Sequence, residues 1–75
     1  MEKLLEKLRE IRDDIDFENE TALIDGKRLA SFDIIRIVGM IEDEYDVKIP
    51  VSQLKPENFN SANALYALIQ RLEED

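Results

Sequence analysis

The sequence predicts an all-α fold, a four-helix bundle with a long first loop and a short third helix. Three observations lead to this prediction. Apolar residues recur every three or four positions in three separate stretches, no stretch alternates in the way of a strand, and 75 residues suffice for one domain. Helices with one apolar face bury that face by packing against each other. Residues 1–75 are therefore expected to form a single domain.

The first helix is predicted over residues 2–14. Four apolar residues fall there at spacings of four, three and four, namely Leu4, Leu8, Ile11 and Ile15. Charged residues fill most positions between them, so the helix has one apolar and one solvated face.

A long loop is expected over residues 14–30, because this stretch has neither a helical nor a strand period. Its irregularly spaced apolar residues suit a connection that crosses the helix ends and is anchored at Phe17, Leu23, Ile24 and Leu29. Gly26 is expected to supply a turn shortly before the next helix. A loop of this length is unusual in a small domain unless it has a function.

The second helix is predicted inside residues 29–50, with Ser31 at its N-terminus. Its apolar stripe consists of Ile34, Ile37, Val38, Ile41 and Tyr45, widened by Ile35. Its other face carries Asp33, Glu42, Asp43 and Glu44, with Arg36 as the basic residue. The helix is expected to stop before the Ile49-Pro50 pair, because proline disfavours helical geometry in the residue before it. Residues 46–50 then form an extended connector anchored by Val47 and Ile49.

Two single helical turns and a last helix complete the bundle. The turns are predicted at residues 51–54 and 56–59, with Pro56 at a first helical position. The last helix is expected to begin at Asn60 or Ser61, since both are good N-caps. The predicted core is Leu4, Leu8, Ile11, Ile15, Phe17, Leu23, Ile34, Ile37, Val38, Ile41, Tyr45, Ile49, Leu54, Phe59, Leu65, Leu68 and Leu72.

Composition excludes several classes of function. The chain has no cysteine and no histidine, which removes disulfides, thiolate chemistry and the commonest general base and metal ligand. No nucleophile–base pair is evident, so an enzyme is not expected. The net charge of -8 repels nucleic acid and anionic membranes and favours basic protein partners. The N-terminus lacks the apolar core of a signal peptide and no stretch approaches transmembrane length, so we expect a cytoplasmic protein. We also expect it to be a monomer.

A family resemblance rests on three short segments. They are Ala30-Ser31-Phe32-Asp33, Glu42-Asp43-Glu44-Tyr45 and Ile49-Pro50. Together they resemble the acyl carrier proteins, in which a serine opens an acidic second helix that ends near an Ile-Pro pair. The preceding helix, the long loop and the two later helices also fall where that family has them. The resemblance implies an acyl-carrier-protein-like four-helix bundle over nearly the whole chain.

The resemblance also implies a function for Ser31. In the family this serine is esterified by 4'-phosphopantetheine from coenzyme A, a flexible arm whose thiol holds acyl or aminoacyl groups as thioesters. The implied partners are a phosphopantetheinyl transferase and loading and transfer enzymes with basic docking surfaces. The implied docking residues are Phe32, Asp33, Arg36, Gly39, Met40, Glu42 and Asp43.

The chain departs from the family pattern at three positions. The family usually has aspartate before the serine, where this chain has Ala30. Asp33, in the first helical turn, is a candidate to replace part of that recognition. Arg36 stands where the family often has an acid, and Gly39 where it has a methionine or a similar docking residue. These changes predict a specialised carrier with its own enzymes.

Two other hypotheses remain beside the carrier. In the first, Ala30 prevents modification and the fold acts as an acidic adaptor that docks basic proteins through its second helix. In the second, the loop binds ions, because Asp14, Asp16 and Glu18 alternate like calcium ligands and Asp25 follows eleven residues after Asp14. The sixth position of that pattern is not glycine, the twelfth is not glutamate, and no helix follows at once. A dedicated metal site is therefore not expected, only weak surface binding of divalent ions.

Overall fold

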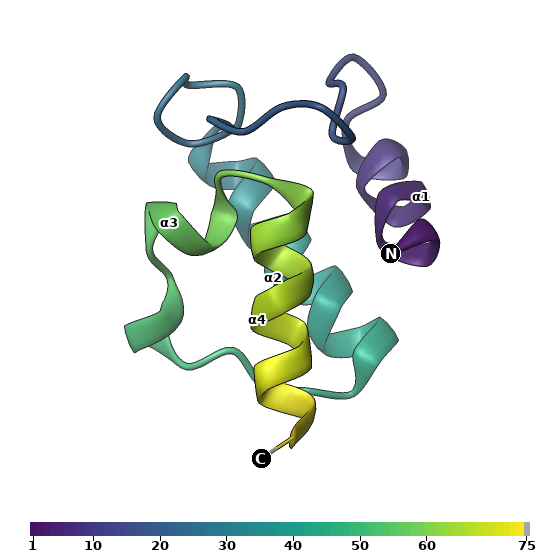
Figure 1. Cartoon of the computed structure of the whole chain (residues 1–75), viewed down its shortest axis with the longest axis vertical. Helices are drawn as coiled ribbons and strands as arrows, with labels where there is room; N and C mark the ends of the chain where they lie inside the picture. Colours follow the sequence, from purple (N-terminus) through teal and green to yellow (C-terminus); the bar gives the residue numbers. More distant parts are fainter. Residues whose placement is uncertain (75) are drawn as a thin grey trace.

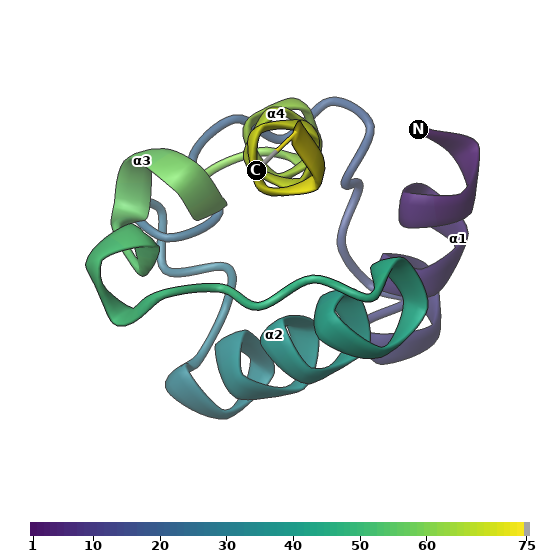
Figure 2. The ribbon, with the colours of Figure 1, turned by 90° about the horizontal axis from the view of Figure 1, so that it is seen from below.

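The fold is an all-α four-helix bundle, as predicted. The computed structural model describes residues 1–74 and contains no strand within them. Its elements are α1 (Glu2–Ile11), α2 (Ser31–Tyr45), the 3-10 turn η1 (Val51–Gln53), α3 (Pro56–Phe59) and α4 (Ala62–Glu74). Figure 1 shows the loop after α1 crossing one end of the bundle, and the connector after α2 crossing the opposite end. Seen along α4, helices α2 and α4 lie on opposite sides of the molecule (Figure 2).

Helix α1 ends three residues earlier than predicted. It stops at Ile11, because Arg12 has extended backbone angles (φ -139°, ψ 101°). Ile15 consequently belongs to the loop, where it is half-buried against the core. The apolar spacing continued past the helix end because the first part of the loop folds back onto the same core.

The long loop is held to the start of α4 by one side chain. Phe17, Leu23 and Leu29 are buried, which confirms the loop as an anchored connection. The Asn60 side-chain oxygen accepts hydrogen bonds from the backbone N–H groups of Ile24 (3.0 Å) and Asp25 (3.1 Å). The loop is thus fixed by polar contacts as well as by apolar anchors.

The turn expected at Gly26 is present, in a run of turn residues from 23 to 27. The residue with left-handed backbone angles is Lys27 (φ 59°), not the glycine. Glycine is needed at 26 for space, since a Cβ there would lie 2.6 Å from the carbonyl oxygen of Ala22. Gly26 therefore allows a close approach of two backbone segments.

Helix α2 ends at Tyr45, so it stops before the Ile49-Pro50 pair as predicted, but the proline is not what ends it. Asp46 adopts left-handed angles (φ 53°, ψ 47°) and turns the chain out of the helix. The connector that follows is extended, and Ile49 is buried in the core as predicted. Glu42 reaches across to it, its carboxylate accepting the Ile49 backbone N–H at 3.0 Å.

The short turns and the last helix lie where they were expected. Pro56 is the first residue of α3, and its missing N–H has no intrahelical partner to lose. The hydroxyl oxygen of Ser61 accepts the N–H of Ala64 at 3.0 Å, which makes Ser61 the N-cap of α4. Of the two expected caps, serine therefore caps the helix while Asn60 holds the loop.

Most of the predicted core is buried or packs against it. The fully enclosed members include Leu4, Leu8, Phe17, Leu23, Ile37, Ile41, Leu65 and Leu68. The assignment of Leu54 to the core is wrong, because this residue is 44% exposed. Four buried apolar residues are absent from the predicted core list, namely Leu5, Leu29, Ala62 and Ile69, although Leu29 was expected as an anchor of the loop. The helices of residues 1–74 are too short or too polar to cross a membrane.

Candidate functional site

Ser31 is the first helical residue of α2 and is exposed to solvent. The N-cap is Ala30, which has extended backbone angles (φ -87°, ψ 166°) and no side-chain hydrogen bond to the helix. The serine therefore stands one position later than a capping serine. It belongs to the first turn of a helix whose exposed N–H groups favour an anion nearby.

Asp33 completes the start of α2 from within the helix. Its Oδ2 accepts the backbone N–H of Ala30 at 3.0 Å and also contacts Arg12 Nη1 at 2.7 Å. The residue is only 6% exposed. The bond from Ala30, opposed by burial and aided by the Arg12 guanidinium, lowers the pKa of the Asp33 carboxyl.

The position of Asp33 corrects two sequence predictions. It does not belong to the exposed acidic face of α2, because its carboxylate is buried and paired. For the same reason it cannot present a carboxylate to a docking partner in place of the missing aspartate at Ala30. An acidic residue at the third helical position can accept the backbone N–H of the N-cap residue. The spacing of Ala30 and Asp33 is the sequence signal for this bond.

Arg12 connects this helix start to α1 and to both ends of the long loop. Its guanidinium binds both carboxylate oxygens of Asp14 at 2.8 Å while Nη1 holds Asp33. The same Nη1 donates a longer bond to the carbonyl oxygen of Arg28 (3.4 Å). The hydrogen bond from Arg12 lowers the pKa of Asp14 to about 2. The sequence pattern does not reveal the role of Arg12, because two of its partners, Arg28 and Asp33, lie 16 and 21 residues away.

The exposed face next to Ser31 is apolar and basic. Phe32 and Ile35 are each 67% exposed, and the Arg36 guanidinium lies 5.8 Å from the centre of the Phe32 ring. The exposure of Phe32 agrees with its expected role as an apolar contact. The assignment of Ile35 to the buried stripe is wrong, because this side of the helix faces solvent.

The other predicted docking residues divide into two groups. Gly39 and Asp43 are exposed, and a Cβ at Gly39 would meet nothing within 4 Å. Met40 is half-buried against the core, and Glu42 is half-buried and bonded to the connector. A continuous accessible face thus contains Phe32, Arg36, Gly39 and Asp43, whereas Met40 and Glu42 contribute mainly to the fold.

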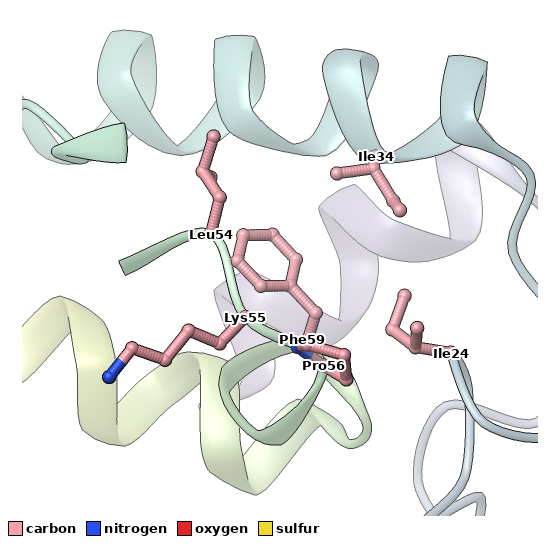
Figure 3. A pocket seen from close by; sticks show the side chains of 6 residues that line it. All are labelled: Ile24, Ile34, Leu54, Lys55, Pro56 and Phe59. Atoms are coloured by element: carbon pink, nitrogen blue, oxygen red, sulfur yellow. The ribbon is translucent and has the colours of Figure 1, made fainter. Parts of the chain in front are cut away.

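An apolar pocket of about 170 Å³ lies beside α2, one turn after Ser31 (Figure 3). Its walls come from the long loop, α2 and the η1–α3 region, and they are Ile24, Ile34, Leu54, Lys55, Pro56 and Phe59. In Figure 3 the Phe59 ring lies between Leu54 and Ile34, and the Lys55 ammonium group points away from them. Leu54 is exposed because it forms the wall of this open pocket, which corrects its assignment to the closed core.

The acidic residues of the loop do not converge. Asp14 pairs with Arg12, Glu18 with Arg9, and Asp25 with Asn60. Within residues 1–74, no three acidic side chains gather in a way that could hold a metal ion. The loop geometry therefore gives the ion-binding hypothesis no support.

No protein-family model matches this sequence, and a search of curated proteins finds no match. The resemblance to acyl carrier proteins consequently depends on the motif around Ser31 and on the order of the helices.

Proposed function

We propose that this chain is a cytoplasmic carrier protein that bears 4'-phosphopantetheine on Ser31. The arm would hold acyl or aminoacyl groups as thioesters and deliver them to enzymes of a lipid, polyketide or related biosynthetic pathway. The observation that carries this proposal is the state of Ser31, which is exposed at the first position of α2 and makes no cap bond. Its hydroxyl is free to be esterified without cost to the helix.

The apolar pocket supports a carrier of acyl groups. Its walls near α2 are hydrocarbon, contributed by Ile24, Ile34, Leu54 and Phe59. An apolar cavity of roughly 150 Å³ accommodates a molecule the size of benzene. The pocket of about 170 Å³ therefore has room for about six carbon atoms of a cargo that the flexible arm carries.

The proposal is tested by intact mass after incubation with coenzyme A, Mg²⁺ and a broad-specificity phosphopantetheinyl transferase. The wild-type protein should gain one phosphopantetheine unit, and Ser31→Ala should gain none. Ser61→Ala is the matched control, because it removes a serine at the start of another helix and should leave the mass gain unchanged. A wild-type protein that stays unmodified, while Ala30→Asp is modified, would show that alanine before the serine prevents this modification.

The second candidate is an unmodified adaptor that docks proteins through α2. The exposure of Phe32 and Ile35 favours it, since two large apolar side chains in contact with water are typical of an interaction surface. The two functions share this surface and differ at Ser31. An unmodified wild-type protein in every transferase reaction would favour the adaptor.

A further inference from the structure

We infer that Arg12 and Asp33 are a positioning pair, which fixes the backbone at Ala30 and thereby the place where Ser31 is presented. This inference rests on the proposed function of Ser31 and names the groups that regulate its accessibility. Neither residue touches the serine hydroxyl in the proposed role. Both act through the main chain that precedes it.

The first step is the missing cap. Alanine has no side-chain acceptor, so residue 30 cannot hold the first N–H groups of α2 in the way that Ser61 does at α4. An uncapped helix start exchanges readily between helical and open forms. Asp33 compensates by accepting the Ala30 N–H at 3.0 Å, which closes the first turn around Ser31 from the inside.

The second step is the orientation of Asp33. A buried carboxylate is costly unless it is paired and hydrogen-bonded. Arg12 supplies the pairing through Nη1, at 2.7 Å from the same oxygen that holds Ala30. One carboxylate oxygen is thus fixed between a guanidinium from the end of α1 and the N-cap backbone of α2. Its position depends on both.

The third step is the contact with the loop. Arg12 also holds Asp14 at the beginning of the loop and the Arg28 carbonyl near its end. The guanidinium therefore holds together the beginning and the end of the loop that leads to Ala30. Movement of the loop and fraying at Ser31 are expected to be coupled through this one side chain.

Burial distinguishes positioning from partner recognition. Asp33 is 6% exposed, so an enzyme that docks on α2 contacts Phe32 or Arg36 before it. Loss of an exposed docking residue should raise KM for the carrier. Loss of the positioning pair should instead lower kcat, because the enzyme binds the same surface but finds the hydroxyl in place less often.

The experiment measures kcat and KM for phosphopantetheine transfer to Ser31, using a broad-specificity transferase and coenzyme A. The variants are Arg12→Met, Arg12→Lys, Asp33→Asn and Asp33→Ala. Arg12→Met and Asp33→Ala are expected to lower kcat about tenfold with KM changed less than about twofold. Arg12→Lys should recover part of the rate, because lysine keeps one charged contact, and Asp33→Asn should lie between Asp33→Ala and wild type, because asparagine keeps an acceptor for Ala30.

Two controls separate positioning from general stability. Glu10→Gln removes a carboxylate that pairs with Lys7 on α1, away from Arg12 and Asp33, and should leave kcat unchanged. Ile69→Val removes one buried methyl group in α4 and should lower the melting temperature without changing kcat. Amide hydrogen exchange followed by NMR supplies a readout that needs no transferase. In Asp33→Ala, the Ala30 N–H should exchange at least tenfold faster, while the N–H of Ala64 should not change.

Unchanged kcat together with unchanged exchange at Ala30 in Asp33→Ala would overturn the inference. A rise in KM alone would also overturn it, since that result assigns Asp33 to docking. Failure of the proposed function gives a different pattern, in which wild-type Ser31 is never modified but exchange at Ala30 still accelerates in Asp33→Ala and Arg12→Met.

Discussion

The starts of α2 and α4 face the same physical problem and solve it with different residues. Each helix begins with N–H groups that lack intrahelical partners, and each is reached by chain that must be held in place. At α4, Ser61 caps the helix and Asn60 holds the long loop. At α2, Asp33 bonds the N-cap backbone from inside the helix and Arg12 holds the loop.

The difference leaves one serine bonded to its helix and the other exposed. Ser61 precedes its helix and its hydroxyl oxygen is occupied by the Ala64 N–H. Ser31 lies one position further along, inside α2, where the bond from Ala30 to Asp33 secures the turn. Of these two serines near helix starts, Ser61 therefore caps its helix, whereas Ser31 is exposed.

The largest effect is expected when Asp33 is replaced, because α4 has no residue in the equivalent role. Asp33→Ala should lower the free energy of unfolding at pH 7 by about 2 kcal/mol, because a buried hydrogen bond to a charged group contributes roughly 1.5–3 kcal/mol. Urea unfolding followed by circular dichroism measures it. Asp33→Asn, which keeps an acceptor, should lose less than Asp33→Ala. Equal losses in the two variants would show that the bond to Ala30 contributes nothing.

A pH dependence follows from the same carboxyl. Its pKa is lowered in the folded protein, chiefly by the Ala30 N–H. The stability it contributes is therefore complete above its unfolded pKa of about 3.9, and is lost as pH falls through its lower folded pKa. The difference in unfolding free energy between wild type and Asp33→Ala should be constant from pH 7 to about pH 5 and shrink below about pH 4. For Ile69→Val the corresponding difference should not change with pH, and a parallel decline there would contradict the assignment.

The fold was predictable because its signals are local. Helical spacing and cap residues lie within a few positions of each other, so α3 began at Pro56 and α4 after Ser61 as expected. The end of α1 was placed three residues too late, because the extended backbone angles at Arg12 decided it. Those angles depend on contacts that periodicity does not report.

The site was predictable only in part, because its geometry depends on distant contacts. Motif position identified Ser31 and the exposed Phe32. The burial of Asp33 follows from Arg12, which is 21 residues away in the chain. The apolar pocket likewise joins Ile24, Ile34 and Phe59 from three separate segments. Spacing along the sequence can identify apolar residues, but it does not show which of them the fold brings together in one site.

Replacing each of the two serines by alanine should have a smaller effect on the free energy of unfolding, and it compares their roles directly. Ser61→Ala should cost about 1 kcal/mol, the usual value for loss of a capping serine. Ser31→Ala should change the free energy of unfolding by less than about 0.5 kcal/mol, as an exposed substitution outside any cap bond does. Thermal and urea unfolding of both variants under identical conditions provide the measurement. A cost at Ser31 equal to that at Ser61 would mean that both hydroxyls cap their helices and that Ser31 is not free.

The smallest effect comes from giving α2 the kind of cap that α4 has. In Ala30→Ser the introduced hydroxyl stands at a position whose backbone angles already suit an N-cap, so it can accept the Asp33 N–H while Asp33 keeps the N–H of residue 30. The two bonds form a complete capping box, and we expect a gain of about 0.5 kcal/mol, at the low end for a capping serine because Asp33 already closes the turn. Urea unfolding measures the gain, and Ala30→Val is a control that adds a side chain without an acceptor. If Ala30→Ser instead gains well over 1 kcal/mol, Asp33 compensates poorly for the missing cap, and the start of α2 is open more often than its hydrogen bonds indicate.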